Sequence, residues 1–335
     1  MTHVVSRTPF RVSFFGGGTD YPAWYRREGG AVLSTAVDKY CYISCRYLPP
    51  FFPDAYRVVW AHIETVSSIS EILHPAVREG LRMLEFEGGR GVEVIYQGDL
   101  PARTGMGSSS AFAVGLIHAL SALHGARPDK PTLYRRAIEL EQDWLQDSVG
   151  SQDQVAAAVG GMNVIRFGTD GGIDVEPLAL PPARFEALRD RLMMFYTGRT
   201  RLASNLAAQV VRNMDQRTAH LRRMRAMVDQ AAGILTGDGD LDDFGRMLDE
   251  TWRLKRELSE GIANETIDDI YARGLAAGAL GGKLLGAGSS GFMLFHVPPD
   301  RHEAVCQALS DLMAVPFGLD TQGSTLLYNA ADDGR

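Results

Sequence analysis

Pro101-Ala102-Arg103-Thr104-Gly105-Met106-Gly107-Ser108-Ser109-Ser110-Ala111 lies between a strand-like segment at 92–96 and an apolar helical pattern at 111–123. Glycines let a backbone approach an anion closely, and the unpaired N–H groups at a helix N-terminus attract negative charge. The stretch lacks the lysine of a Walker A loop and the spacing of a Rossmann fingerprint. A plain turn with a serine N-cap is the alternative. Three consecutive serines favour a phosphate-binding loop, because one hydroxyl can cap the helix while another ligates magnesium.

Size and charge limit the classes of function. The chain has 335 residues, 45% of them hydrophobic, which is enough for a substantial core and two domains. Its net charge of −7 and pI of about 5.6 predict no broad basic surface, so we expect neither nucleic acid nor an anionic membrane as a partner. The first residues lack a signal-peptide pattern, and no apolar run reaches about 18 residues. We therefore expect a cytoplasmic protein.

Three cysteines, Cys41, Cys45 and Cys306, occur in the chain. Cys41 and Cys45 share a strand-like segment, where a spacing of four places them on one face but too far apart for a disulfide. No second pair of Cys or His residues lies nearby to complete a zinc site. The pattern predicts buried thiols in a reduced protein.

The predicted strands and helices form two lobes. Strands are predicted at 11–15, 31–35, 40–47, 56–62, 92–96, 162–167, 173–178, 192–196, 284–285, 292–297 and 324–328. Helices are predicted at 70–83, 111–123, 132–147, 201–254 with a break at 237–240, 266–277 with Thr266 as its cap, and from about 301. Pro181-Pro182 marks the predicted boundary between an N-terminal domain, 1–180, and a C-terminal domain, 181–335. The pattern favours an α+β fold, and the helices of 201–254 suit either internal packing or a homodimer interface.

A carboxylate is predicted on the buried face of the helix that Thr132 would cap. Glu141 lies in the middle of an apolar stripe, whereas Glu139 faces the other way. The stripe consists of Tyr134, Ala137, Ile138, Trp144 and Leu145. A buried carboxylate is costly unless it is paired or binds a metal. The alternatives are an ion pair with an arginine and a magnesium site shared with a serine hydroxyl.

A second acidic residue, Asp153, lies in the segment Val149-Gly150-Ser151-Gln152-Asp153-Gln154. It either caps a short helix or orients the proton of an attacking hydroxyl. The small residues around it leave room for a ligand.

Two further glycine-rich loops accompany the serine loop. In Arg11-Val12-Ser13-Phe14-Phe15-Gly16-Gly17-Gly18-Thr19-Asp20-Tyr21, the glycines end a strand and are expected to expose Thr19 and Asp20, which suit binding of sugar hydroxyls. Arg11 is placed to support a carboxylate or steer a phosphate. The stretch Lys283-Leu284-Leu285-Gly286-Ala287-Gly288-Ser289-Ser290-Gly291 is either a hairpin turn or a flexible loop that closes over phosphates.

Taken together, these loops resemble the GHMP kinase family, which includes galactokinase, homoserine kinase, mevalonate kinase and phosphomevalonate kinase. Residues 101–110 match the second family motif, Pro-x-x-x-Gly-Leu-Gly-Ser-Ser-Ala, with Met106 in place of leucine and Ser110 at the alanine position. Residues 11–21 match the first motif and 283–291 the third. The resemblance implies an N-terminal domain like ribosomal protein S5 domain 2, a ferredoxin-like C-terminal domain, and ATP with magnesium.

The resemblance also implies roles for individual residues. Asp153 would be the base or positioning carboxylate, with Arg11 beside it and the reacting hydroxyl. Ser109 would ligate magnesium with Glu141 as its carboxylate partner. The ATP-binding set would be Pro101, Gly105, Met106, Gly107, Ser108, Ser109 and Ser110, and the sugar-binding set Gly18, Thr19, Asp20 and Gly288, with Arg201.

Within the family, residues 10–20 and 149–154 are most similar to sugar kinases that phosphorylate D-glycero-D-manno-heptose 7-phosphate at the anomeric oxygen. Galactokinases carry a Glu-His pair where this chain has Gly17-Gly18, which argues for a roomier substrate pocket. Arg199 and Arg201 are candidates for binding the 7-phosphate, or else are plain solvent-exposed arginines. A fucokinase-like kinase of an unphosphorylated sugar and a catalytically silent ATP- and sugar-binding regulator are the alternatives.

Overall fold

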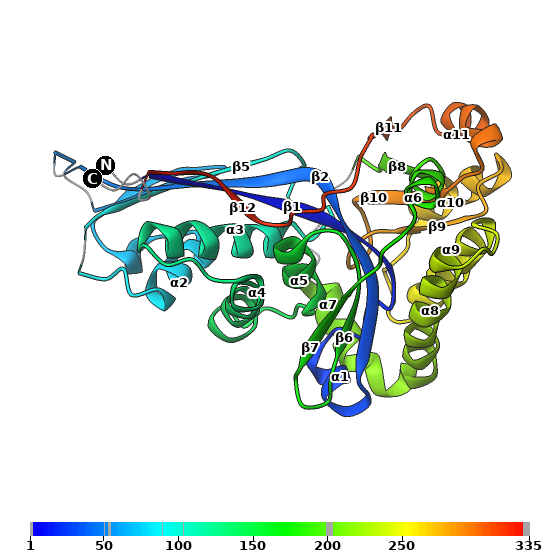
Figure 1. The fold of residues 1–335 in the computed structure, drawn as a ribbon, viewed down its shortest axis with the longest axis horizontal. Helices are drawn as coiled ribbons and strands as arrows, with labels where there is room; N and C mark the ends of the chain where they lie inside the picture. Colours follow the sequence, from blue (N-terminus) through cyan, green and yellow to red (C-terminus); the bar gives the residue numbers. More distant parts are fainter. Residues whose placement is uncertain are drawn as a thin grey trace.

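The computed structural model describes residues 3–49, 51–52, 55–88, 90–102, 104–198 and 204–330. These residues form two lobes, each built around a β-sheet with helices packed against it (Figure 1). Helices and strands are segregated within each lobe, which confirms the predicted α+β class.

The first lobe is built on the long pair of strands β1 (His3–Phe15) and β2 (Gly30–Tyr47), which run antiparallel. The sheet order is β12-β1-β2-β5-β3-β4, with β6 on another part of β2 and β7 on β6. The added strands are β3 (Tyr56–Val59), β4 (Ile63–Val66), β5 (Val92–Gly98), β6 (Met162–Phe167), β7 (Ile173–Pro177) and β12 (Thr325–Asn329). The sequence predicted two strands at 31–35 and 40–47, but β2 is one continuous strand that pairs with β6 and β5 in turn.

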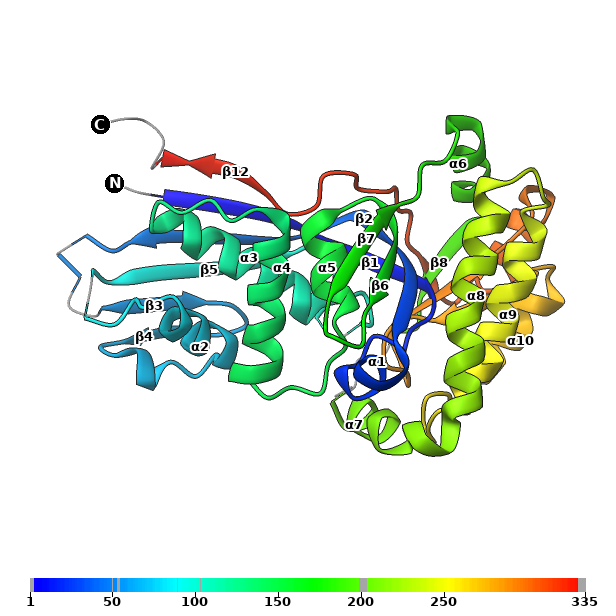
Figure 2. The same cartoon turned by 60° about the horizontal axis from the view of Figure 1, so that its bottom comes forward.

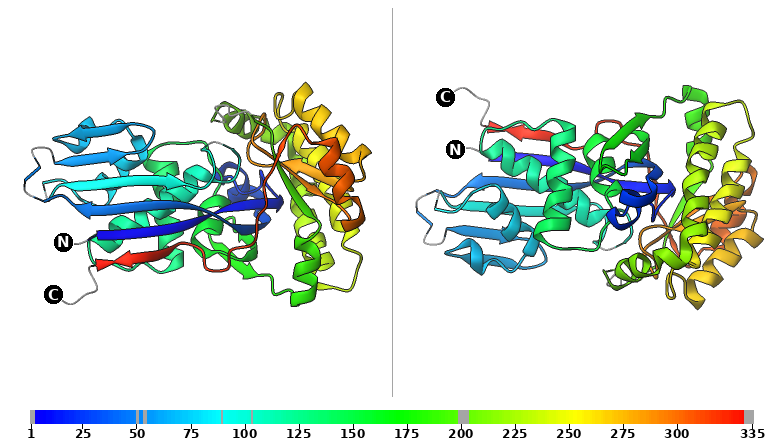
Figure 3. Two further views of the ribbon diagram at one scale, coloured as in Figure 1. Left: turned by 90° about the horizontal axis from the view of Figure 1, so that it is seen from above. Right: turned by 90° about the horizontal axis from the view of Figure 1, so that it is seen from below.

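Helices cover one face of this sheet. Seen from above, the strands lie in front, and seen from below, the helices do (Figure 3). The covering helices are α2 (Pro75–Met83), α3 (Ser108–Leu123), α4 (Lys130–Glu139) and α5 (Gln152–Val159), and α1 (Pro22–Glu28) lies at the end of β1. The central helix, α3, is buried along nearly its whole length, because it packs against β1, β2, α4 and α5. A helix that is apolar on all sides is typical of such a position.

The second lobe has a four-stranded antiparallel sheet in the order β11-β8-β10-β9. Its strands are β8 (Leu192–Tyr196), β9 (Gly281–Leu284), β10 (Phe292–His296) and β11 (Met313–Ala314). Numbered along the chain, this order is 4-1-3-2, which is the predicted ferredoxin-like arrangement. Helices α6 (Pro182–Arg189), α7 (Ser204–Asn213), α8 (Thr218–Thr236), α9 (Asp242–Arg256), α10 (Glu265–Ala276) and α11 (His302–Ala308) complete the lobe, with α8 and α9 side by side (Figure 2). Short 3₁₀ turns lie at η1 (Ile69–Glu71), η3 (Met214–Arg217) and η4 (Pro299–Arg301).

The C-terminal strand departs from the predicted division of the chain. The sequence assigned 181–335 to one domain, but β12 pairs with β1 and belongs to the first sheet. The domain boundary predicted at Pro181-Pro182 stays a prediction. Along the chain, the strands and helices of the second lobe follow β7 and precede β12.

Two predicted helix caps are wrong. Thr132 does not cap its helix, because Asp129 is the N-cap and accepts a hydrogen bond from the backbone N of Thr132 at 2.8 Å. Likewise Thr266 lies inside α10, whose N-cap is Asn264. In both cases an Asp or Asn side chain upstream of the predicted cap accepts a hydrogen bond from the backbone N of the third helical residue.

Cys41 and Cys45 are buried on β2 and unpaired, as predicted. Within the described ranges, no helix combines the length and apolar character that crossing a bilayer requires.

An aromatic cluster joins the two lobes. Phe244 of α9 packs edge-on against Phe14 and Phe15 at the end of β1, with ring centroids 5.3 and 5.0 Å apart. All three rings are buried. On the same side, α8 contacts the first glycine-rich loop, since a Cβ on Gly16 would lie 2.7 Å from Val228 Cγ2.

We predict that Phe244→Ala destabilises the protein by about 3–5 kcal/mol, because it removes a buried ring and leaves a cavity between the lobes. Urea unfolding followed by fluorescence or circular dichroism measures this loss. Phe51→Ala is the matched control, since Phe51 is 87% exposed, and should change the free energy of unfolding by less than about 0.5 kcal/mol. Equal losses in the two variants would contradict the assigned packing.

Candidate active site

Arg11 joins three segments that are far apart in the sequence. Its Nε and Nη2 donate to the two carboxylate oxygens of Asp153, each at 2.7 Å, and its Nη1 donates to the carbonyl of Gly105 at 2.7 Å. Its backbone N donates to the carbonyl of Met106 at 3.1 Å. The guanidinium is buried, so this two-pronged ion pair lies in surroundings where charge-assisted hydrogen bonds are strong. Strand β1, the serine loop and α5 are thereby held at one point.

The serine loop is shaped by two glycines with left-handed backbone angles. Gly105 has φ +82° and Gly107 has φ +73°, and Gly107 is the N-cap of α3. A Cβ on Gly107 would lie 3.1 Å from Asp153 Oδ2, so the loop passes directly over that carboxylate. The helix begins at Ser108, three residues before the predicted start at 111, and the predicted serine N-cap is wrong because Gly107 takes that position. The N-terminus of the helix opens beside Asp153 and Arg11.

Glu141 lies in a π-helical turn, Leu140–Trp144, that continues α4. The sequence predicted an ordinary helix here, and the wider turn explains why Trp144 is 42% exposed although the stripe placed it inside. The prediction that Glu141 is buried is confirmed. Its Oε2 accepts hydrogen bonds from Ser110 Oγ and Gln154 Nε2, each at 2.6 Å. π-turns inside α-helices are frequent at functional sites.

The environment of Glu141 favours its protonated form in the absence of a cation. Burial raises its pKa to about 7, with the charge of Asp153 adding to the rise, while hydrogen bonds from Ser110, Gln154 and Ser109 oppose it. Its second oxygen, Oε1, is buried and has no hydrogen-bond partner among the described residues. The structural alternative, an ion pair with an arginine, is absent from the described part of the chain around Glu141. An unpartnered buried carboxylate oxygen beside serine hydroxyls fits a hard cation.

No cluster of three or more His, Cys, Asp or Glu side chains suited to a metal occurs within the described ranges. Magnesium that arrives with nucleotide phosphates needs only one or two protein ligands. Glu141 and Ser109 therefore suffice as a donor set.

Asp20 lies beside Asp153 but is more deeply buried. Its Oδ1 accepts a hydrogen bond from the backbone N of Gly18 at 2.9 Å, and Gly150 packs directly against its carboxylate. Burial and the nearby charge of Asp153 raise the pKa of Asp20, and hydrogen bonds from Gly18 and Gln152 oppose this.

The predicted exposure of Thr19 and Asp20 is wrong. Thr19 is fully buried, and its hydroxyl donates to the carbonyls of Gly16 and Ala31 at 2.8 and 2.9 Å. These bonds fold the first glycine-rich loop back on β2, so the hydroxyl of Thr19 serves the loop. Asp20 is 2% exposed.

The third loop contacts the serine loop backbone to backbone. A Cβ on Gly286 would lie 2.2 Å from the Cα of Gly105, and one on Gly291 would lie 2.2 Å from the carbonyl oxygen of Thr104. Gly288, predicted to bind substrate, packs instead against the backbone of Ile262. The third loop therefore faces the serine loop through Gly286 and Gly291.

Two lysines that the sequence analysis did not single out support these loops. Lys255 of α9 donates to the carbonyls of Leu284 and Gly286, and Lys283 of β9 donates to the carbonyl of Phe14 at 2.8 Å. Burial lowers the pKa of Lys255 to about 7, and Arg11 adds to the shift. Burial also lowers the pKa of Lys283, with Lys255 and Arg11 adding and Asp20 opposing. The sequence does contain a signal for Lys283, because it is a single charged residue between Gly282 and Leu284 in an otherwise apolar strand.

The remaining predicted residues are placed as follows. Ser109 is exposed at the start of α3, Pro101 is exposed, and Met106 is fully buried. Gly18 touches Leu221 of α8 and donates to Asp20. Arg199 and Arg201 lie outside the described residues. The site thus brings together Arg11, Asp20, Ser109, Glu141 and Asp153, an arrangement that can hold a polyanion at a helix N-terminus beside an oriented carboxylate.

Two family models match the sequence. The model of the GHMP kinases N terminal domain matches residues 72–161, and the GHMP kinases C terminal model matches 227–314. The two models together cover more than half of the chain, and they include the serine loop and the third loop. The chain belongs to the GHMP kinase family. It is a kinase that transfers a phosphoryl group to a hydroxyl.

Individual relatives include kinases named for sugars. The chain is 25% identical over 333 residues to a D-glycero-alpha-D-manno-heptose 7-phosphate kinase of Campylobacter jejuni, covering 92% of this chain and 94% of that protein. It is 27% identical over 342 residues to an L-fucokinase/L-fucose-1-P guanylyltransferase of Bacteroides fragilis, covering 90% of this chain and 35% of that protein. The crystal structure of a D-glycero-D-manno-heptose 1-phosphate kinase from Bacteroides thetaiotaomicron matches with a TM-score of 0.78 and 22% identity over 97% and 99% of the two chains, which shows a shared fold.

We predict that Gly105→Ala lowers the affinity for ATP by at least about tenfold, or 1.4 kcal/mol, because its Cβ would lie 2.3 Å from the carbonyl oxygen of Leu285 and displace the serine loop. Gly125→Ala is the matched control: Gly125 has nearly the same φ, +80°, but nothing lies within 4 Å of its Cβ position. Both variants carry the same backbone strain, so titration calorimetry with ATP isolates the loop contact. Equal affinities would rule out a role for the contact.

We predict that Glu141→Gln makes the protein less sensitive to rising pH. The folded-state pKa of about 7 exceeds the ordinary 4.5, so ionisation of Glu141 costs stability progressively between these pH values, reaching about 3 kcal/mol above pH 7. Glutamine carries no charge, so the melting temperature of the variant relative to wild type should rise from pH 5 to pH 8 in metal-free buffer. Glu303→Gln, which alters an exposed side chain, should show no such trend. A flat difference for Glu141→Gln would show that Glu141 ionises normally.

Proposed function

We propose that the protein is an ATP-dependent sugar kinase that phosphorylates the anomeric hydroxyl of D-glycero-D-manno-heptose 7-phosphate, giving the 1,7-bisphosphate. The observation that carries the proposal is the Arg11–Asp153 ion pair directly beneath the serine loop. An oriented carboxylate next to a phosphate-binding helix N-terminus is what transfer to a hydroxyl requires. The heptose 7-phosphate kinase among the relatives supports the choice of acceptor.

In the proposed reaction, ATP lies with its phosphates at Gly105, Gly107 and the start of α3. The backbone N–H groups there stabilise the negative charge that spreads over the transferred group. The loose transition state of phosphoryl transfer depends on alignment and charge neutralisation more than on covalent help.

Magnesium fits beside Glu141 and Ser109, where it would neutralise phosphate charge. The unpartnered Oε1 of Glu141 supports this assignment. Ser110 and Gln154 hold the other carboxylate oxygen and so fix the direction in which Oε1 points.

Asp153 orients the acceptor hydroxyl and takes its proton. Arg11 donates a hydrogen bond to each oxygen of Asp153 and so holds the carboxylate in one orientation. An anomeric hydroxyl is more acidic than an ordinary alcohol, so a modest base is sufficient. Asp20, the next carboxylate along the site, accepts hydrogen bonds from other sugar hydroxyls.

A fucokinase-like activity on an unphosphorylated sugar is the second candidate, favoured by the 27% identity to the Bacteroides fragilis protein. Coupled measurement of ADP release with heptose 7-phosphate, fucose, mannose, galactose and mevalonate separates the candidates. We expect the highest kcat/KM with heptose 7-phosphate. A preference for fucose would favour the second candidate, and ATP binding without turnover of any sugar would favour a silent regulator.

We predict, in the same assay, that Asp153→Asn lowers kcat by about 10²–10⁴-fold, because the hydroxyl loses its proton acceptor. The affinity for ATP should stay within about threefold, since Asp153 faces the acceptor and the helix N-terminus is unchanged. Asp174→Asn, an exposed aspartate on β7, is the control and should retain full turnover. Unchanged turnover in Asp153→Asn would reject the assigned role.

A further inference from the structure

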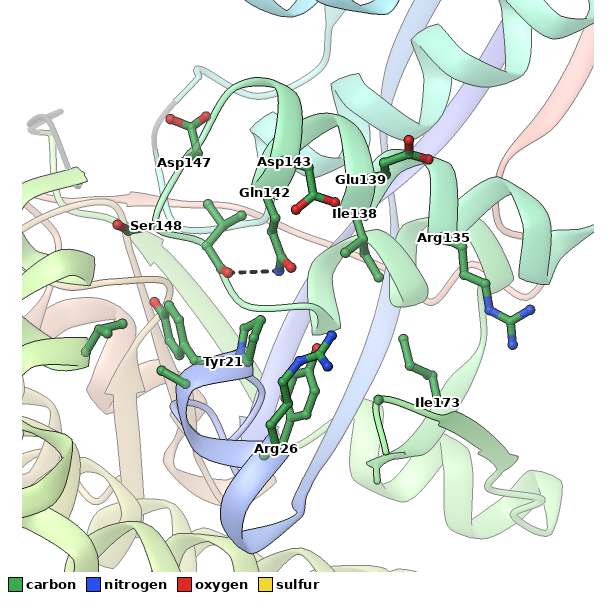
Figure 4. Close-up of a pocket in the computed structure, with 16 residues that line it drawn as sticks. Tyr21, Arg26, Arg135, Ile138, Glu139, Gln142, Asp143, Asp147, Ser148 and Ile173 are labelled. Atoms are coloured by element: carbon green, nitrogen blue, oxygen red, sulfur yellow. Dashed lines mark hydrogen bonds between the residues drawn. The ribbon is translucent and has the colours of Figure 1, made fainter. Parts of the chain in front are cut away.

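A pocket of about 560 Å³ opens between α1, the α4–π-helix segment and residues 147–149 (Figure 4). Its lining combines apolar side chains with charged ones. Tyr21 and Ser148 lie at one end, Arg135 lies toward the other, and Arg26 projects between them (Figure 4). None of these residues takes part in the site around the serine loop.

The pocket adjoins the part of the site proposed to bind the sugar. Tyr21 directly follows Asp20, and burial together with the charges of Asp20 and Asp153 raises the pKa of Tyr21. On the opposite side, Val149 lines the pocket, Gly150 packs against the Asp20 carboxylate, and the backbone N of Ser151 donates to the carbonyl of Asp20 at 2.9 Å. Residues on both sides of the pocket's end thus contact Asp20.

Two guanidinium groups in the pocket, those of Arg26 and Arg135, are available to a ligand, although that of Arg135 lies over the Tyr134 ring, 5.9 Å from its centroid. Within the described ranges, Arg26 and Arg135 make neither an ion pair nor a hydrogen bond, whereas the adjacent Arg27 pairs with Asp215 at 2.7 Å. Guanidinium groups are well suited to bind phosphate through paired hydrogen bonds. Arg26 lies one turn into α1, so its Cα is about 6 Å along the helix axis from the residue after Tyr21. An acceptor molecule several carbons long could span this distance between the Asp20 end of the pocket and Arg26.

Carboxylates in the same pocket narrow the class of ligand. Glu139, Asp143 and Asp147 also line it, and they would repel a bare anion. Carboxylates accept hydrogen bonds from hydroxyl groups, so a chain of hydroxyls ending in a phosphate satisfies both kinds of lining. Inorganic phosphate could bind the arginines but would offer the carboxylates no sugar hydroxyl groups.

We propose that this pocket binds the distal, phosphate-bearing end of the sugar acceptor, with Arg26 as the main phosphate contact and Arg135 as the second. The inference rests on the proposed sugar kinase function and makes these two arginines the determinants of preference for a phosphorylated sugar. It requires no contribution from residues 199–203.

Steady-state kinetics with heptose 7-phosphate and with unphosphorylated heptose test the proposal. Arg26→Gln should raise KM for the phosphorylated sugar by about 10–100-fold, the range expected for a lost charge-assisted hydrogen bond, while KM for plain heptose and for ATP changes less than about threefold. Arg135→Gln should act in the same direction with a smaller effect, and Arg26→Lys should retain part of the preference.

Arg27→Gln is the matched control, because it removes an equal charge from the adjacent position of α1 and should leave both KM values unchanged. A preference for heptose 7-phosphate that survives in the Arg26→Gln, Arg135→Gln double variant would overturn the pocket assignment alone. A wild-type enzyme that turns over neither heptose, or both equally well, would overturn the proposed acceptor and the pocket together. Weak competition by inorganic phosphate in wild type would support a ligand that also needs hydroxyls, and strong competition would contradict it.

Discussion

The ion pair between the buried Arg11 and the partly buried Asp153 is the interaction on which the arrangement of the site depends. Bringing two charges out of water is costly, and the cost is recovered only when geometry is good and the remaining donors are satisfied. Arg11 meets both conditions, since its third nitrogen reaches the carbonyl of Gly105 and its backbone binds Met106. Because strand β1, the serine loop and α5 converge on one guanidinium, small changes in any of them alter the position of the carboxylate.

Backbone contacts between glycines set how closely the two lobes approach at the site. Gly105 meets Gly286, and Thr104 meets Gly291, at distances that leave no room for a Cβ. Lys255 fixes the carbonyls of the third loop, and Lys283 crosses from β9 to the end of β1. With Arg11, these lysines place three basic side chains around the serine loop and the third loop, and burial lowers the pKa of both lysines. Burial thus favours the neutral forms of the lysines, whereas a polyanion bound nearby would favour their charged forms.

Much of the fold was predictable from the sequence because its local signals agree with the tertiary structure. The strands β6 and β8, the existence of α3 after the serine loop and the burial of Glu141 follow from periodicity and from glycine placement. Features fixed by distant contacts were not predictable. The π-turn at Leu140–Trp144 changes the helical period, so the stripe that located Glu141 misplaced Trp144. Thr19 is polar and follows a glycine, which favoured the prediction of an exposed side chain. Its hydroxyl instead donates to the carbonyl of Ala31 on the next strand. The roles of Lys255 and Lys283 depend on loops contributed by other parts of the chain.

Pairing of β12 with β1 has a consequence for how the protein is made. Val4 lies opposite Asn329, so the edge of the first sheet is finished by residues that the ribosome adds after every element of the second lobe. The sheet of the first lobe can form most of its strands early, but one edge of β1 remains open during synthesis, and an open edge is a site for unwanted pairing with other chains. Closure of that edge requires translation to have passed residue 329, so this side of β1 stays unprotected until the second lobe has been synthesised.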